Sequence, residues 1–215
     1  MLTSKYCAEP GSILVEEFGL CEGSVRADLA VVNGVLKGFE IKSERDSLAR
    51  LPRQVVTYNL IFDTVSLMAA DRHLVNARKI IPDWWGIYLI ERPRRADGRP
   101  KIKLVRREKP NPDVDAYAVA QLLWKEEATE ILRLVSPSAK LARKAREAIW
   151  TELSESLPLI ELKKATRDAL KKRKSRQSVQ AQEQCDETSL PASISSGCLS
   201  RIFDIRTLRY IHRPS

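Results

Sequence analysis

The stretch RADLAVVNGVLKGFEIKSERD, residues 26–46, predicts a β-hairpin that carries three charged side chains within its two strands. Residues 25–32 and 35–42 alternate apolar with other side chains and are rich in Val and Ile, as half-buried strands are. The dipeptide Asn33-Gly34 between them is a strong short-range hairpin signal. We therefore start from this hairpin and ask why its strands contain charges.

The register of the hairpin decides which side chains share a face. A two-residue loop would place Asp28 opposite Phe39 and so put an acid into the core face. A three-residue connection over residues 33–35 instead pairs Leu29 with Phe39 and Asp28 with Glu40. We expect this longer connection, because it keeps the apolar side chains together.

With this register, the carboxylates of Asp28 and Glu40 lie side by side, at the Cβ separation of about 5 Å of a cross-strand pair. Two like charges so close repel each other, and a divalent cation between them reverses the sign of that interaction. Lys42 lies on the same face one pleat further along, where its ammonium is able to orient a water molecule or hold a phosphate oxygen. The pattern indicates cleavage of phosphodiesters with Mg²⁺ or Mn²⁺.

The composition excludes several other kinds of chemistry. The 215 residues include only two histidines, which argues against a His-based triad or a His-rich metal centre. The four cysteines lack the C-x-x-C spacing of a zinc site and indicate free thiols in a reducing compartment. A net charge of +9, concentrated in residues 94–107 and 163–176, favours a polyanionic partner or a solvated basic face.

The rest of the chain predicts an α/β core with a mixed sheet, followed by a small helical subdomain. The expected core elements are a helix over 11–19, the hairpin, a helix from about Pro52, a strand over 64–70, a helix over 72–81, and strands over 84–92 and 101–107. Three helical segments are expected over 116–135, 137–156 and 158–174.

These elements divide the chain into three parts. Residues 1–108 form the α/β domain, and residues 109–174 form the basic helical subdomain after a proline-bearing linker. From Ser175 the composition shifts to Gln, Ser, Thr and Glu, so residues 175–215 are expected to be a disordered tail. No apolar run approaches the roughly 20 residues that span a bilayer, and the N-terminus resembles no signal peptide, so we expect a cytoplasmic protein without membrane contact.

The hairpin resembles the PD-(D/E)XK nuclease superfamily, whose hallmark is an acid on one strand and Glu-x-Lys on the next. Asp28 matches the first acid and Glu40-Ile41-Lys42 the second motif, while Ala27 replaces the usual proline. A preceding acid often completes the metal site there. Glu17 or Glu16 stands at that place, and the similarity to the pattern of MmcB-like DNA repair nucleases favours Glu17.

Two further features strengthen this resemblance. Gln54 and Tyr58 follow Lys42 with the spacing of the Q-x-x-x-Y element of RecB-type nucleases, and a separation of four places both on one helix face. Residues from about 10 to 172 also resemble a family of small uncharacterised bacterial proteins that is placed in this superfamily. No specific reaction is attached to that family, so only the nuclease-like site is implied.

The resemblance implies a restriction-endonuclease-like core and a Mg²⁺-dependent deoxyribonuclease, with RNA as an alternative substrate. Glu17, Asp28, Glu40 and the backbone carbonyl of Ile41 would hold one Mg²⁺ or Mn²⁺, and Lys42 would position the attacking water. Gln54 and Tyr58 would support the substrate phosphate. Ser43 either binds the phosphate or forms a turn. DNA repair, phage defence and maintenance of a mobile element are the contexts that remain open.

Further residues are expected to bind nucleic acid or to pack in the protein core. Basic side chains near the site and on the last helix are candidates for phosphate contact: Arg50, Arg53, Lys171, Lys172 and Arg173. For the helical subdomain, a bundle that merely covers a sheet edge is an equal alternative. At least one of Trp84 and Trp85 is expected in the core, and Trp124 and Trp150 are expected to be packing residues.

Two other functions remain open. One is a protein that keeps the fold and binds nucleic acid without cutting it. The other is a regulatory protein whose basic helices and C-terminal tail dock an unidentified protein partner. Cutting both strands of a duplex at once requires two sites, so a homodimer is compatible with the nuclease function.

Overall fold

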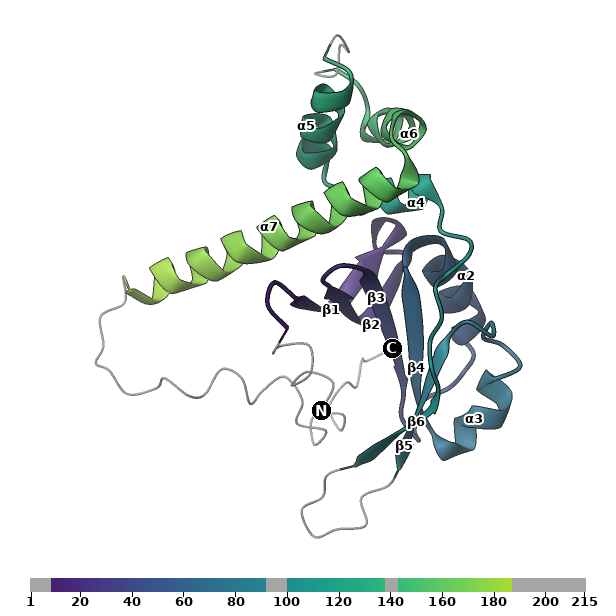
Figure 1. The fold of residues 1–215 in the computed structure, drawn as a ribbon. Coiled ribbons are helices and arrows are strands. Elements are labelled where there is room, and N and C mark those ends of the chain that lie inside the picture. Colours follow the sequence, from purple (N-terminus) through teal and green to yellow (C-terminus); the bar gives the residue numbers. More distant parts are fainter. Residues whose placement is uncertain (1–8, 92–99, 138–142, 187–215) are drawn as a thin grey trace.

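The computed structural model describes residues 9–91, 100–137 and 143–186, and its strands form one six-stranded mixed sheet (Figure 1). The strands lie in sequence order across the sheet: β1 Ile13–Leu20, β2 Val25–Val32, β3 Leu36–Lys42, β4 Thr64–Ala70, β5 Gly86–Glu91 and β6 Lys101–Arg106. The pairs β3–β4 and β4–β5 are parallel, and the other three are antiparallel. The predicted α/β class with a mixed sheet is confirmed at this level.

The central hairpin has the predicted register. Leu29 pairs with Phe39 and Val32 with Leu36, which leaves a connection of three residues, 33–35. The Asn33 side chain closes this turn, because its Oδ1 accepts a hydrogen bond of 3.0 Å from the backbone N–H of Val35. Continuing the register by one residue places Asp28 opposite Glu40.

Strand β1 corrects the prediction of a helix over 11–19. Its residues pair with β2 in one continuous register from Ile13 to Leu20, since the β-branched and aromatic side chains gain more by packing on the sheet than as an isolated helix. Glu17 interrupts the strand with a φ of 49°, a conformation that a non-glycine residue rarely adopts. Val15 and Phe18 therefore both face the main core although they are three residues apart.

Two helices of the α/β part follow the hairpin. Helix α2, Leu51–Ile61, begins with Pro52 in its first turn as predicted, and it buries Gln54 and Tyr58 against the sheet. Helix α3, Asp71–Ala77, is shorter than the predicted 72–81, and residues after Ala77 form turns. A short 3-10 helix, η1 Cys21–Gly23, joins β1 to β2.

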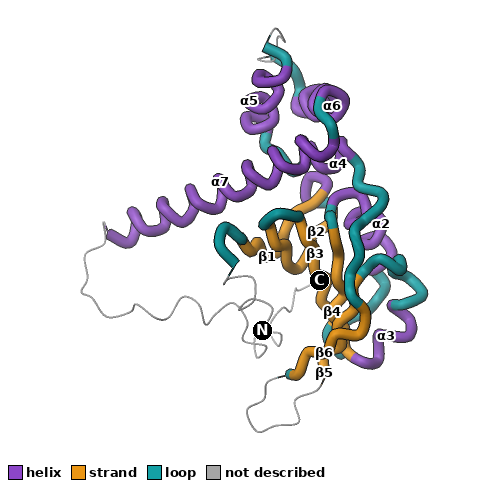
Figure 2. Tube along the Cα trace, viewed as in Figure 1, coloured by secondary structure: helices purple, strands orange, loops and turns teal. Residues whose placement is uncertain are grey.

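The last part of the described chain is helical, as expected, with different boundaries (Figure 2). Its helices are α4 Ala116–Ala120, α5 Lys125–Val135, α6 Arg146–Ser156 and α7 Leu159–Asp186. The segment predicted as one helix over 116–135 is broken between α4 and α5. No helix among the described residues is long and apolar enough to cross a membrane.

Helix α7 also corrects the predicted boundary of the tail at Ser175. It continues through Asp186, because a helix that is already nucleated adds residues at little cost and the Gln, Ala and Glu residues there are good helix formers. Residues 187–215 of the expected tail lie outside the described residues.

The described residues form three apolar clusters, two of them on opposite faces of the sheet. One sheet face packs under α2, α3 and α4, with Tyr58, Phe62 and Trp85 at its centre. A separate cluster around Trp150 and Leu153 holds the helical subdomain together. Helix α7 joins the two, because Leu170 belongs to the first cluster and Leu162 to the second.

Candidate functional site

Glu40 and Lys42 form a buried ion pair near the end of β3. Their side chains lie on the same face, with Lys42 Nζ 2.6 Å from Glu40 Oε1. Glu40 is 1% exposed and Lys42 3% exposed. Charged residues are almost never buried so deeply unless they are paired, so the contact between the two side chains is what allows both to be buried here.

Helix α2 supplies the remaining partners of this pair. Gln54 Nε2 donates to Glu40 Oε1 at 2.7 Å, and Lys42 Nζ donates to Gln54 Oε1 at 3.1 Å. The Tyr58 hydroxyl donates to Glu40 Oε2 at 2.5 Å. The predicted spacing of four between Gln54 and Tyr58 therefore brings both to Glu40, where they fix the orientation of its carboxylate.

Asp28 completes the group on the neighbouring strand. Its Oδ2 accepts a hydrogen bond of 2.6 Å from the backbone N–H of Ile41. Burial, together with the nearby Glu40 carboxylate, raises the pKa of Asp28 to about 7. Glu17 adds to this shift, so its charge also acts on the site.

The predicted third acid lies at the distorted point of β1. Continuing the β1–β2 register places Glu17 directly across from Asp28, so Glu17, Asp28 and Glu40 occupy one row over three adjacent strands. Glu17 is exposed, and its positive φ breaks the regular alternation of side chains at this row. Such irregularities re-aim side chains and are frequent beside active sites.

The electrostatics of the row also act on Tyr58. Burial and the charge of Glu40 raise the pKa of the Tyr58 hydroxyl above its ordinary value. The hydroxyl therefore keeps its proton and remains a hydrogen-bond donor to the carboxylate throughout the physiological range of pH.

Ser43 belongs to a turn. Its backbone N–H and its hydroxyl both donate to Asp46 Oδ2 at 2.6 Å. The Nε2 atom of the buried His73 lies 2.9 Å from the Ser43 carbonyl oxygen and links this loop to α3. Of the two roles predicted for Ser43, the turn is the one that its contacts support.

The predicted phosphate-binding cations fall into two groups. Arg50 and Arg53 are exposed at the start of α2, next to the buried network. On α7, Lys172 is exposed and Lys171 is half-buried, whereas Arg173 pairs with Glu127. Arg173 also donates to the carbonyl of Leu122 at 3.0 Å, so it holds helices together.

Some residues with evident roles were not predicted. Asp63 accepts from the backbone N–H of Leu36 at 2.6 Å and pairs with Lys163 and Arg167, which fastens α7 to the sheet. Trp124 is 54% exposed, so its predicted packing role is wrong, whereas Trp85 and Trp150 are buried as expected. Trp124 is exposed because it lies in the break between α4 and α5. No Gly or Pro in the sequence indicates this break.

Within the described residues, no group of three or more His, Cys, Asp or Glu side chains is already arranged around a common metal position. Asp28 and Glu40 are instead engaged with Ile41 N–H and with the Lys42, Gln54 and Tyr58 donors.

Comparison with known proteins places the chain in a family. Residues 1–196 match the family model described as bacteriophage P4 protein cII, and the chain belongs to that family. Protein cII of Enterobacteria phage P4 is 26% identical over 143 residues, which are 66% of this chain and 53% of that protein. The chain thus spans about half the length of this curated relative.

One solved structure is also similar in part. The SPO1766 protein of unknown function from Silicibacter pomeroyi matches 62% of this chain and 86% of its own, with a TM-score of 0.36 and 17% identity.

Proposed function

We propose that this protein is a metal-dependent nuclease that hydrolyses phosphodiester bonds of DNA, with RNA as an alternative substrate. The observation that carries the proposal is the row of three acids over β1, β2 and β3 beside a buried lysine. Burying the carboxylate of Asp28 next to that of Glu40 costs free energy. This cost is seen in the raised pKa of Asp28.

The donor set fits a hard divalent cation. Glu17, Asp28 and Glu40 would hold Mg²⁺ or Mn²⁺, and the carbonyl oxygen of Ile41 would add a ligand. Asp28 Oδ1 accepts no hydrogen bond from the described residues, so it is available to a cation. When bound, such a cation lowers the pKa of water and offsets negative charge on a phosphate.

The side chains of the chain itself have distinct roles in this proposal. Lys42 offers an ammonium next to Glu40, where it orients a water molecule or contacts a phosphate oxygen. Gln54 and Tyr58 are positioning residues, because they hold the Glu40 carboxylate from α2. Arg50 and Arg53 would contact the nucleic-acid backbone beside the site.

A second candidate is a protein that binds nucleic acid without cutting it. The exposures of 1% for Glu40 and 3% for Lys42 favour it, since a buried pair whose two partners are both hydrogen-bonded is also what a purely structural network looks like. The match to a bacteriophage protein family, whose description names no reaction, supports a regulatory role that involves a protein partner better than it supports the nuclease. The same family match fits a role in phage or mobile-element biology better than a role in general DNA repair.

Cleavage of labelled single-stranded, duplex and branched DNA with Mg²⁺ or Mn²⁺ separates these candidates. We expect cutting by the wild-type protein, loss of cutting in Asp28→Ala and Lys42→Met, and retention in Asp113→Asn, which changes an exposed acid in a loop. Circular dichroism checks that each variant is folded. DNA binding without cutting by the folded wild-type protein would establish the second candidate instead. Light scattering of the same samples tests the proposed homodimer, and fractionation of cells tests the proposed cytoplasmic location.

A further inference from the structure

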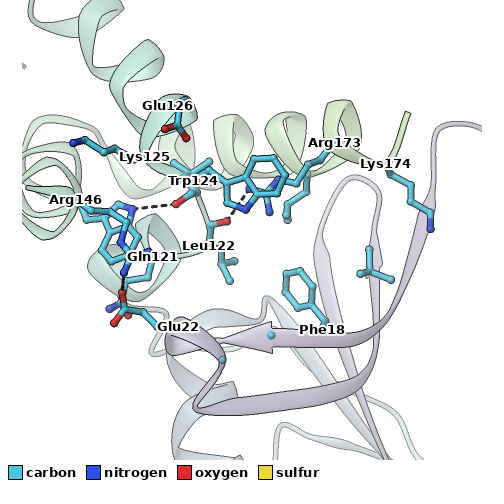
Figure 3. A pocket seen from close by; sticks show the side chains of 16 residues that line it. Phe18, Glu22, Gln121, Leu122, Trp124, Lys125, Glu126, Arg146, Arg173 and Lys174 are labelled. Carbon is cyan, nitrogen blue, oxygen red and sulfur yellow. Dashed lines mark hydrogen bonds and ion pairs between the residues drawn. The ribbon is translucent and has the colours of Figure 1, made fainter. Parts of the chain in front are cut away.

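A cleft of about 890 Å³ lies between the β1 edge of the sheet and the helices α5 to α7, with the connection over 121–124 as part of its wall (Figure 3). Phe18 of β1 and Glu22 of η1 line it from the sheet side, and Trp124 lines it from the helices. Phe18 directly follows Glu17 in β1, but neither Glu17 nor Asp28, Glu40 or Lys42 lines the cleft, so it is separate from the row of acids. Its volume is in the range of ligand sites.

Trp124 gives the cleft an exposed aromatic surface. The side chain is 54% exposed, which is unusual for the largest apolar residue in a protein. The guanidinium of Arg173 lies 4.1 Å from the ring centroid, held there by Glu127 and the Leu122 carbonyl. A stacked guanidinium occupies one face of a ring, so the indole is held in place with its remaining surface open.

The charged side chains of the cleft are mainly cationic. Lys125, Arg146, Arg173 and Lys174 line it, against the acids Glu22 and Glu126. Arg146 pairs with Glu22 and lies 4.7 Å from the ring centroid of Trp150, which fixes this cation between the sheet and the helices. An aromatic platform bordered by cations is the arrangement that binds a polyanion with planar groups.

We infer that this cleft binds single-stranded nucleic acid, with a base stacked on Trp124 and the adjoining phosphates near Lys125 and Lys174. A single strand fits because its bases are free to stack on a side chain, whereas those of a duplex are stacked on each other. The inference rests on the proposed function, because it concerns the same class of target. It adds a second surface, separate from the row of acids, at which a single strand would be held.

The test is the affinity for a fluorescein-labelled oligo(dT) of about 12 nucleotides, measured by anisotropy in EDTA so that no cutting occurs. The variants are Trp124→Ala, Trp124→Phe and Leu134→Ala. Leu134 is 81% exposed on α5, the helix that begins directly after Trp124, and it does not line the cleft, so its variant controls for the loss of an exposed apolar side chain.

We expect Trp124→Ala to weaken oligo(dT) binding by about tenfold or more, because one stacked base is lost. Trp124→Phe, which keeps a ring, should retain most of the affinity, and Leu134→Ala should bind like the wild type. Unchanged binding by folded Trp124→Ala, or absence of oligo(dT) binding by the wild type, overturns the inference. Trp124-dependent binding without DNA cleavage by the wild type contradicts the nuclease but supports the cleft.

Discussion

Replacing Asp28 by Asn tests the charge repulsion within the row of acids, because the change removes a charge and alters the packing very little. The pKa of Asp28 is raised to about 7 from 3.8, first by burial and then by the Glu40 carboxylate. Between these two values the folded protein binds a proton that the unfolded chain does not bind. The free energy of unfolding therefore falls as the pH rises from about 4 to about 7 and is level above that.

The size of this effect follows from the shift. About three pKa units at 1.36 kcal/mol each set a ceiling of about 4 kcal/mol, and because Asp28 is half-buried, solvent screening lowers this to about 2 kcal/mol. Asp28→Asn removes the charge and keeps an oxygen for the N–H of Ile41. The variant should therefore be more stable than the wild type at pH 8, by about 2 kcal/mol.

Urea unfolding in EDTA at pH 5 and pH 8 measures this difference. At pH 5 the wild-type Asp28 is mostly protonated, so the two proteins should differ by less than they do at pH 8. Asp113→Asn serves as control, because Asp113 is exposed. If Asp28→Asn is no more stable than the wild type at pH 8, the charge repulsion assigned to this row is wrong.

Three other predictions concern the hydrogen bond from Tyr58 to Glu40, the sheet and α7. Tyr58→Phe loses the hydrogen bond to Glu40 and should lower the free energy of unfolding, measured in urea, by about 2 kcal/mol. An unchanged midpoint would mean that this hydrogen bond contributes nothing to stability. Gly38→Ala should destabilise by about 1–3 kcal/mol, because its Cβ would lie 2.7 Å from the Phe62 ring, and thermal unfolding should show Gly34→Ala, which meets no atom within 4 Å, nearly unchanged. Lys172→Ala should reduce the salt dependence of DNA binding, lowering the slope of log affinity against log salt by about one unit, and an equal reduction in exposed Lys79→Ala would contradict a specific role for α7.

The central hairpin was predictable because its local signals agree. Asn33 and Gly34 marked the turn, and the need to keep Leu29 against Phe39 selected the three-residue connection that the structure has. That register alone placed Asp28 beside Glu40, and the spacing of Gln54 and Tyr58 predicted that one helix face would meet them. The site was predictable because the alternation of side chains along a strand and the spacing of residues along a helix are local properties of the sequence.

Other features depend on contacts that local patterns do not contain. The stretch ILVEEFGL satisfies both a helical and an extended pattern. It forms a strand because it pairs with β2. The boundary at Ser175 followed composition, while α7 extends a helix already held by Leu162 and Leu170. The exposure of Trp124 arises from the break between two helices, which only their tertiary packing determines.

The most direct test of the row of acids is calorimetric titration of the metal-free protein with Mn²⁺ at pH 7.5, beside Asp28→Asn and Asp113→Asn. We predict binding by the wild type and by Asp113→Asn, with protons released as Asp28 loses its own, and a loss of binding in Asp28→Asn. Equal binding by all three proteins, or no binding by the folded wild type, would contradict the assignment of these acids to a cation site.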